Sequence, residues 1–278
     1  IATEITLRIL KSAESICVLL ADFTTVEAAA ESVSDIISAG IIPGGMEMMD
    51  NISINAVEDV VATNCYPRDA TAILLVEIDG LDVEVTANKQ RVAEICLKNG
   101  ARNITSASDL ETRLKLWKGR KAAFAAAGHL SPDYYVQDGV IPRTQLPYVL
   151  QEIEALSRKY GYEIANVFHA GDGNLHPLIL FDNSVKGALE KVEELGGEIL
   201  KLCVRVGGSI SGEHGIGADK KCYMPDMFSE TDLETMQWIR QVFNPQGLAN
   251  PGKIFPTPRT CGEAASASKQ QFEGVELF

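Results

Sequence analysis

Apolar positions along the chain repeat one pattern four times: a short apolar run, an amphipathic stretch, a glycine, and a second apolar run. Apolar residues of the amphipathic stretch recur at helical spacing, and the glycine after it supplies the left-handed residue that ends many helices. Each unit is therefore expected to form strand, helix and strand. The predicted helices cover residues 25–39, 85–99, 144–160 and 185–206.

A further helix is predicted over residues 108–128, between the second and third units. Ser108 and Glu111 have the spacing of a capping box, and Gly128 ends the pattern. Its expected apolar stripe consists of Leu110, Leu114, Trp117 and Phe124. Arg120 follows Trp117 by one turn and lies beside this stripe. A cation late in a helix often only complements the helix dipole, so the spacing alone assigns Arg120 no function.

Two strand–helix–strand units joined by a hairpin form a βαββαβ, or ferredoxin-like, arrangement. The segment 171–174 joins the third and fourth units in this way. The sequence therefore predicts an α+β fold: a duplicated ferredoxin-like sandwich with an antiparallel sheet covered by helices. We expect one domain over residues 13–225, with halves at 13–107 and 130–225. A final helix over about residues 230–243, preceded by Ser229 as a cap, and rigid turns are expected within 226–258. A flexible tail is expected over 259–278 because that segment is small and polar.

Three of the four histidines occur in two glycine-rich motifs, residues 169–176 and 212–215. If Asp172 and Gly173 form a two-residue turn, His169 lies directly opposite His176 on one side of the sheet. Two such imidazoles can share a metal ion, with Glu213 as a third ligand and further positions open. The alternative is a purely structural hairpin, since Asp-Gly is a common turn. His129 has no neighbouring histidine or acidic residue and is expected in an exposed loop.

Composition narrows the function classes. The 278 residues are 46% hydrophobic and 23% charged, as in an ordinary globular protein. A formal charge of −13 excludes a basic surface for nucleic acid. We find no signal peptide and no apolar run of about 18 residues, so no transmembrane segment is expected. The six cysteines lack regular spacing, and Cys17 and Cys96 lie in apolar runs. Free thiols in a reducing compartment are therefore expected, with a cytoplasmic location.

Four segments carry a family resemblance: residues 131–143, 169–176, 209–217 and 244–253. In this order they resemble the C-terminal region of FAD-linked oxidases of the vanillyl-alcohol-oxidase-like superfamily. Segment 131–143 is most similar in pattern to the glycolate oxidase flavin subunits and D-lactate dehydrogenases. The resemblance implies a substrate, or cap, domain and FAD as a cofactor.

The resemblance also implies that residues 1–12 are the closing strand of an FAD-binding domain. The alternation over 4–9 fits such a strand, yet the chain has no glycine-rich diphosphate-binding loop after a strand. We therefore expect a fragment whose FAD is bound mainly by a domain absent from this chain, and which is inactive alone. Asn250 and Lys253 are expected to lie near the flavin in the whole enzyme.

In the similar enzymes, a small 2-hydroxy acid gives a hydride to FAD. The resemblance implies a divalent metal, zinc or manganese, on His169, His176 and Glu213. His214, next to Glu213, fits the general base because an imidazole titrates near neutral pH, although it could instead support the ligands or be a further one. The resemblance implies Arg120 as the group that binds the substrate carboxylate. An iron–sulfur partner subunit is also implied, and a homodimer is compatible with it.

The chain departs from the 2-hydroxyglutarate dehydrogenases of this family. Those enzymes carry a threonine and a lysine where this chain has Phe124 and Val136. Without groups for a second carboxylate, a short substrate such as glycolate or D-lactate is expected. Two other readings stay open from the residues alone. One is a metal-dependent hydrolase with His214 as base, and the other is a non-catalytic binding domain with a structural metal.

Overall fold

Seven strands form one antiparallel sheet in a computed structural model that describes residues 3–9 and 11–256. The strand order is β4-β1-β3-β2-β7-β9-β5. Two short strands, β6 and β8, pair with each other separately. The strands are β1 (Ser15–Phe23), β2 (Gly45–Asp50), β3 (Ala72–Gly80), β4 (Ala101–Ala107), β5 (Asp133–Val136), β6 (Gly139–Val140), β7 (Ile164–Phe168), β8 (Asn174–Leu175) and β9 (Pro177–Phe181). The predicted α+β class with an antiparallel sheet is confirmed.

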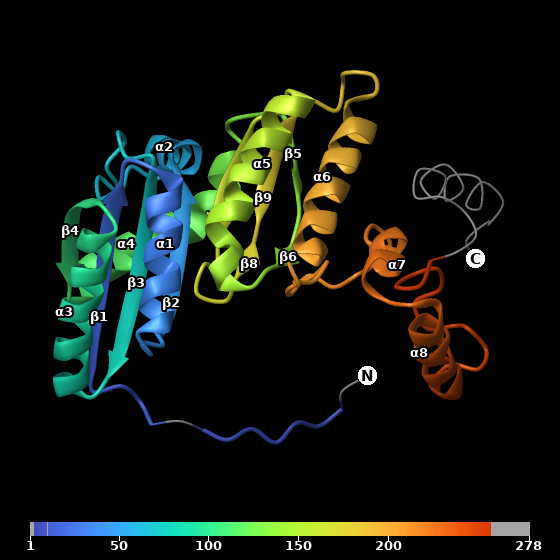
Figure 1. Cartoon of the computed structure of the whole chain (residues 1–278), viewed down its shortest axis with the longest axis horizontal. Helices are drawn as coiled ribbons and strands as arrows, with labels where there is room; N and C mark the ends of the chain where they lie inside the picture. The colour runs from blue at the N-terminus through green and yellow to red at the C-terminus, as the bar shows by residue number, and fades with distance from the viewer. Residues whose placement is uncertain (1–2, 10, 257–278) are drawn as a thin grey trace, which may run out of the picture.

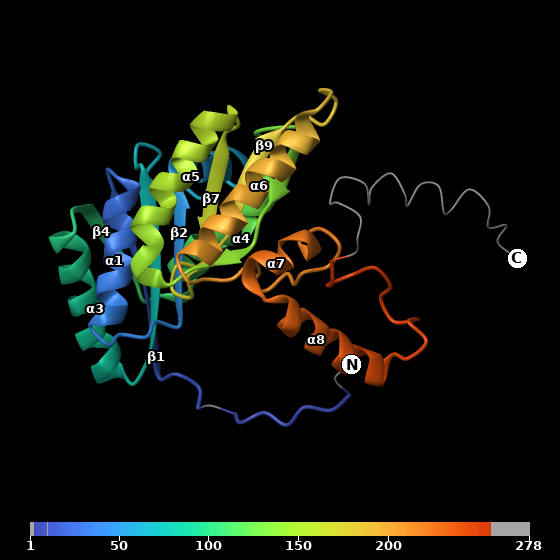
Figure 2. The same cartoon turned by 45° about the vertical axis from the view of Figure 1, so that its right-hand side comes forward.

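Helices cover both faces of the sheet (Figures 1 and 2). One face carries α1 (Val26–Ser38), α3 (Asp82–Lys98), α5 (Leu146–Tyr160) and α6 (Ala188–Arg205), and the other carries α2 (Asn51–Val60) and α4 (Leu110–Ala127). Successive residues of a strand alternate between the two cores: Leu19 faces α1 and α3, whereas Leu20 faces α2 and α4. Because both faces are buried, the strands appear in the sequence as continuous apolar runs.

The two predicted halves share this sheet. They meet where β2 pairs with β7, through Met48 opposite Phe168 and Met49 opposite Val167. The first half has the order strand, helix, strand, strand, helix, strand, with α2 added between β2 and β3. Helix α2 was not predicted. In the second half, the strand expected at residues 209–211 forms only an isolated bridge between Ser209 and Val140. The ferredoxin-like description of each half remains our interpretation of this order.

Residues 3–9 form no strand with any described residue, and Ile5, Leu7 and Ile9 are exposed. Their expected role as the closing strand of an FAD-binding domain stays a prediction. The expected capping box of α4 is wrong. Helix α4 is capped by Asp109, which accepts a hydrogen bond from the Thr112 amide at 2.8 Å, rather than by Ser108.

The buried face of α4 also differs from the predicted stripe, because Leu110 and Leu114 are exposed. The helix instead packs through small residues. A Cβ atom on Gly119 would lie 2.4 Å from the Tyr66 ring, so glycine is needed for this close approach. The same packing buries Arg120, which lies one position further along the helix.

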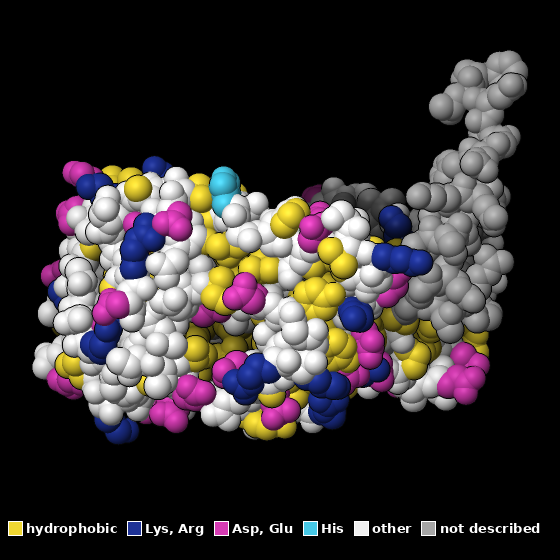
Figure 3. Space-filling model, turned by 90° about the horizontal axis from the view of Figure 1, so that it is seen from above, with side chains coloured by type: hydrophobic (Ala, Val, Ile, Leu, Met, Phe, Trp, Pro, Cys, Tyr) yellow, Lys and Arg dark blue, Asp and Glu magenta, His cyan; other side chains and the backbone are white. Residues whose placement is uncertain are grey.

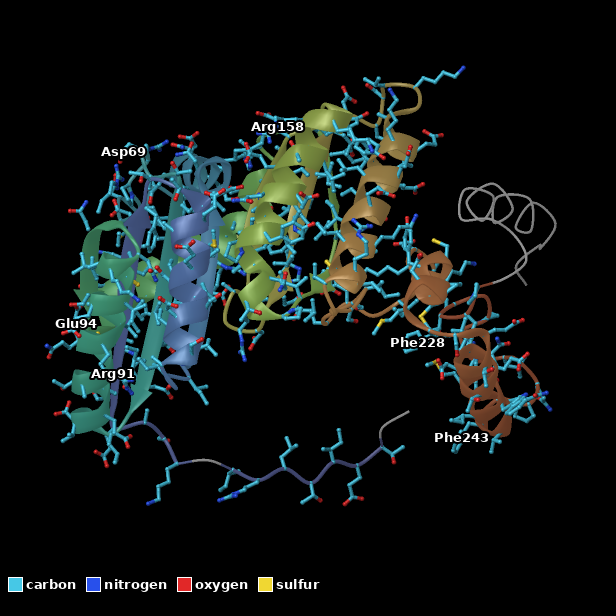
Figure 4. All side chains as sticks on the ribbon, viewed as in Figure 1. Asp69, Arg91, Glu94, Arg158, Phe228 and Phe243 are labelled. Atoms are coloured by element: carbon cyan, nitrogen blue, oxygen red, sulfur yellow. The ribbon has the colours of Figure 1, made fainter. Side chains whose placement is uncertain are left out.

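The C-terminal part lies beside the sheet rather than on it (Figure 2). It contains one 3-10 turn, η2, and two helices at the end of the described chain. In Figure 4, Phe228 marks the link between the helices and Phe243 the far end of the second. The second helix is capped by Ser229 and Asp232, and its Trp238 is 64% exposed. The elements are η2 (Lys221–Tyr223), α7 (Met224–Met227) and α8 (Glu230–Phe243), whereas a further 3-10 turn, η1 (Arg143–Gln145), comes before α5.

Helix hydropathy, surface charge and the state of the cysteines follow the composition in part. Of the helices in residues 11–256, none has the length and apolar content needed to cross a membrane. On the face seen in Figure 3, Lys and Arg side chains are interspersed with Asp and Glu side chains. Cys17, Cys96 and Cys203 are buried free thiols, as expected, whereas Cys222 is disulfide-bonded, contrary to expectation. The tail predicted at 259–278 lies outside the described residues.

Candidate metal and substrate site

The predicted histidine pair lies at the turn between β7 and β8. His169 bridges Asn174, and the amides of Asp172 and Asn174 both donate to the His169 carbonyl, at 3.1 and 3.2 Å. The loop therefore has four residues, and the expected pairing of His169 with His176 is wrong by two positions. An even shift keeps a side chain on the same side of a strand. The two rings consequently still meet, with centroids 5.2 Å apart.

Histidine nitrogens converge on one carboxylate oxygen. Glu213 Oε1 lies 2.9 Å from His176 Nε2, 3.6 Å from His169 Nε2 and 3.9 Å from His214 Nε2. His169, His176 and Glu213 each offer a ligand atom within 4.8 Å of the others. His176 is buried, whereas Glu213 and His214 are about half exposed. The structure thus brings the predicted metal ligands and the predicted base together at a cluster open to solvent on one side.

Glu47 on β2 is a site residue that the sequence analysis missed. Its buried carboxylate contacts His169 Nδ1 at 2.8 Å through Oε1 and accepts a hydrogen bond from Arg120 Nε at 2.9 Å through Oε2. This contact raises the pKa of His169. With Nδ1–H held by a carboxylate, Nε2 of His169 is the free nitrogen facing Glu213, as in carboxylate–histidine–metal sites. The sequence did contain a signal for Glu47: it is a lone acidic residue within the apolar run 46–49. A charge buried in such a run needs a partner, so Glu47 could have been expected to contact a basic side chain.

Arg120 reaches the same carboxylate from α4. Its Nη2 lies 2.8 Å from Glu47 Oε2 but outside hydrogen-bonding geometry, and this buried nitrogen has no hydrogen-bond partner within the described chain. An unpaired buried N–H group is costly, so such a group is well suited to bind a ligand carboxylate. The guanidinium is positioned by Glu47 and keeps a donor available.

His176 lies in the least polar part of the cluster. Burial lowers its pKa, and the neighbouring His169 adds to that effect. Its ring stacks on His214 at 5.2 Å between centroids and meets the edge of Phe124 at 5.7 Å. Its Nδ1 is buried without a partner in the described residues, so ring packing orients His176 in place of a hydrogen bond. A neutral imidazole is the form that binds a metal.

The donor set fits a divalent metal of the zinc or manganese type. Two imidazole nitrogens and one carboxylate oxygen are ligands for such ions, and zinc–nitrogen distances of about 2.0–2.1 Å imply spacings of roughly 3.3 Å between ligands. The Nε2 atoms of His169 and His176 lie close to that distance from Glu213 Oε1. A cavity of about 370 Å³ shares Glu47 with the site and is otherwise lined by Gly44, Arg143, Gly171 and Asp172, among others.

A buried ion pair lies beneath the exposed part of the cluster. The Asp138 carboxylate is fully buried, 3.1 Å from Lys220 Nζ. Burial acts to raise the pKa of Asp138, but hydrogen bonds from the His214 amide, Ser211 and Lys220 outweigh it and hold this pKa below its usual range. A charged carboxylate therefore supports the segment that carries Glu213 and His214.

Asn250 and Lys253 are not brought to this cluster in the described structure. Both are exposed, and their carbonyls accept hydrogen bonds from Arg240 of α8 at 2.6 and 2.9 Å. Lys253 lines a separate cavity of about 510 Å³. Their expected place beside a flavin stays a prediction. His129 is exposed, as expected.

Comparison with known proteins gives relatives along almost the whole chain. It is 52% identical over 263 residues to the glycolate oxidase subunit GlcD of Escherichia coli K12, covering 95% of this chain and 52% of that protein. It is 33% identical to the GlcD subunit of Bacillus subtilis, over 92% of this chain and 54% of the relative. A probable mitochondrial D-lactate dehydrogenase of Danio rerio is 30% identical, over 94% and 52%. The chain thus spans about half the length of these relatives.

Solved structures show the same fold at low sequence identity. A p-cresol methylhydroxylase with bound substrate superposes with a TM-score of 0.67 at 11% identity, over 89% of this chain and 54% of that one. A 4-ethylphenol oxidase from Gulosibacter chungangensis gives 0.66 at 13% identity, over 89% and 55%. The family model of FAD linked oxidases, C-terminal domain, matches residues 12–254. The chain therefore belongs to the FAD-linked oxidase family and comprises its C-terminal domain.

Proposed function

We propose that this chain is the substrate- and metal-binding part of a flavin-dependent oxidoreductase that oxidises a short 2-hydroxy acid, glycolate or D-lactate. The observation that carries this proposal is the bridge made by Glu47, which joins the histidine cluster to Arg120. A group that recognises a carboxylate is thereby held next to a group that can bind a hydroxyl. A 2-hydroxy acid carries these two functions on adjacent carbons.

Each residue has a role in this chemistry. Arg120 holds the substrate carboxylate through Nη2, which makes an ion pair with Glu47 but no hydrogen bond within the described chain. His214 accepts the hydroxyl proton at Nε2, and the α-carbon loses a hydride, which leaves a 2-oxo acid. A divalent metal on His169, His176 and Glu213 would lower the pKa of the substrate hydroxyl. FAD supplies the hydride acceptor, and Asn250 and Lys253 are proposed to approach it.

The surroundings of the cluster favour a short substrate. The Phe124 ring packs edge-on against His176, and Phe124 and Val136 both belong to the apolar core beneath α4. Burying a second carboxylate against these side chains would leave it without a partner, which is costly. The similar proteins include a glycolate oxidase subunit and a probable D-lactate dehydrogenase, whose names indicate substrates of this size.

A chimera tests the proposal. The matched 263 residues of the E. coli GlcD subunit are replaced by this chain, and bleaching of the bound flavin is followed without oxygen after addition of glycolate, D-lactate or D-2-hydroxyglutarate. We expect bleaching with glycolate or D-lactate, and none in the chimera that carries His169→Ala and His176→Ala. The exposed His129→Ala change is the matched control and should leave bleaching intact.

Normal bleaching in the double variant would contradict the proposed site. Chelator-sensitive ester or amide hydrolysis by the chain alone would favour the metal-dependent hydrolase instead. The iron–sulfur partner and the homodimer are further predictions from the family resemblance, and no contact in the described structure identifies a surface for either. The cytoplasmic location is a further prediction from the cysteine pattern.

A further inference from the structure

The segment that carries Glu213 and His214 is held by side chains rather than by a strand ladder. Within the described chain, the amides of residues 211–215 all donate to side-chain oxygens. The Ser211 amide reaches Ser209 Oγ at 3.3 Å, and the Gly215 amide reaches Ser211 Oγ at 2.8 Å. The three amides between them share one acceptor.

That acceptor is the carboxylate of Asp138. Its Oδ1 accepts from the amides of Gly212 and Glu213 at 3.0 and 3.2 Å, and its Oδ2 accepts from the amide of His214 at 3.0 Å. The Ser211 hydroxyl also donates to Oδ2, at 2.9 Å. Successive amides turned toward one anion form a nest, which fixes the backbone around the charge.

Asp138 is itself in register with His176. Gly139 pairs with Leu175, and the Gln137 amide donates to the Pro177 carbonyl at 3.2 Å. The residue between Gln137 and Gly139 therefore faces the residue between Leu175 and Pro177. Asp138 thus lies opposite His176 and also binds the amides of residues 212–214. It therefore fixes the position of residues 212–214 relative to His176.

Lys220 completes the arrangement. Its buried ammonium group donates to Asp138 Oδ2 at 3.1 Å and to the Asp138 carbonyl at 2.7 Å. A fully buried carboxylate needs such compensation. Lys220 and the three amides together surround the carboxylate, so little freedom remains for residues 212–214.

We infer that Asp138 is a positioning residue that holds residues 212–214 so that Glu213 and His214 face His176. The segment from Asp138 to Arg143 was part of the family pattern, but the proposed reaction gives Asp138 no chemical step. This inference rests on the proposed function for the metal set, and its anchoring part can be tested without a metal.

The test compares Asp138→Asn with a matched control, Asp22→Asn, in the whole chain. Asp22 is also buried, in the other half, and accepts hydrogen bonds from Arg102 Nη2 at 2.8 Å and the Asn103 amide at 2.7 Å. Zinc binding is measured by calorimetry, and amide exchange of residues 212–214 by mass spectrometry without metal. Loss of a residue that orients ligands typically weakens metal binding about 10- to 100-fold. We expect that loss and faster exchange only in Asp138→Asn.

Equal zinc affinity in Asp138→Asn and Asp22→Asn, with binding abolished by His176→Ala, would overturn the inference and leave the metal site standing. If the wild-type chain binds no zinc, the proposed metal set fails, and the exchange rates alone then decide whether Asp138 anchors the segment. If Asp138→Asn does not fold, Ser211→Ala takes its place, because it removes one hydrogen bond to Oδ2. Faster exchange there supports the anchor, and unchanged exchange rejects it.

Discussion

At the residue scale, the site depends on a carboxylate with no direct chemical step in the proposed reaction. Glu47 contacts His169 through one oxygen and Arg120 through the other. It therefore sets which nitrogen of His169 faces the cluster and where the guanidinium lies. Both effects require a charged acceptor with two oxygens, which glutamine cannot replace because its amide nitrogen is a donor.

Glu47→Gln is expected to weaken zinc binding about 10- to 100-fold, the usual effect of losing the partner of a ligating histidine. The pKa of His169 should also fall, since Glu47 is the main cause of its raised value. Calorimetry and an NMR titration of the histidines measure the two effects. Glu77→Gln is the control, because Glu77 accepts a hydrogen bond from Trp117, which lies on α4 as Arg120 does. Equal zinc affinity in the two variants would contradict the role of Glu47.

Arg120→Lys keeps the charge but loses the planar fork that binds a carboxylate. A hydrogen bond to a charged group contributes about 1.5–3 kcal/mol, so KM for glycolate in the chimera should rise about 10- to 100-fold. Steady-state flavin reduction measures it. Lys121→Arg, at the exposed next position, should leave KM unchanged. An unchanged KM in Arg120→Lys would remove the carboxylate-binding assignment.

At the element scale, α4 is held against α2 by a short loop after α2. Glu58 at the end of α2 accepts hydrogen bonds from the amides of Asn64 and Tyr66, at 2.8 and 3.2 Å, and from the Thr63 hydroxyl. Tyr66 in turn donates its hydroxyl proton to the Leu116 carbonyl of α4. Glu58 thus fixes the loop against which α4, and with it Arg120, is packed.

Glu58→Gln is expected to lower the free energy of unfolding by about 1–3 kcal/mol at neutral pH, because buried donors lose a charged acceptor. Burial acts to raise the pKa of Glu58, but hydrogen bonds from Thr63 and two amides outweigh it, so the folded pKa lies below the unfolded one. The stabilisation is therefore present above the unfolded pKa of about 4.3 and disappears as pH falls through the folded pKa.

Urea unfolding of wild type and Glu58→Gln over a pH series measures this difference. Asp59→Asn is the control, since Asp59 is exposed and forms a surface ion pair with Arg68 at 2.7 Å. A difference between wild type and Glu58→Gln that stays constant from neutral pH to about pH 3 would contradict the linkage argument.

At the scale of the whole molecule, the site joins the two halves. Glu47 belongs to the first half and His169 to the second. Within the described chain, the two halves of the sheet are joined where β2 pairs with β7, through two residue pairs. Arg120 comes from the helix that links the halves. Binding at the cluster should therefore stabilise the sheet as one unit.

Zinc at about 100 times its dissociation constant should stabilise the chain by roughly 2.7 kcal/mol, which corresponds to an increase in Tm of about 5–10 °C. Calorimetric scans should show one transition that moves as a whole, because the ligands lie in the second half and Glu47, which supports His169, lies in the first. The variant with His169→Ala and His176→Ala should show no shift, and His129→Ala should behave as wild type. Two transitions, of which only one moves, would show that the halves unfold independently.

The sequence by itself determined most of the secondary structure, though not helix α2, and most of the chemical groups of the site, though not Glu47. Helix α8 begins and ends where the pattern placed it, at Glu230 and Phe243, because a capping box and an apolar period are local signals. The side of the strand shared by His169 and His176 also follows from sequence, since it needs only the two-residue period of a strand. The pairing register of the hairpin did not follow from the sequence, because the hydrogen bonds of the turn to the His169 carbonyl set the length of the loop.

Only the tertiary structure decided which distant groups support the site. Glu47 and His169 are 122 positions apart, and Asp138 and His214 are 76 apart, so no local pattern links them. The buried face of α4 was likewise decided by the contact between Gly119 and Tyr66 rather than by the leucines of its sequence. Helix caps and the repeat of apolar residues in a helix or strand depend on residues only a few positions apart. The partners of buried charges are known only when the chain has brought separate elements together.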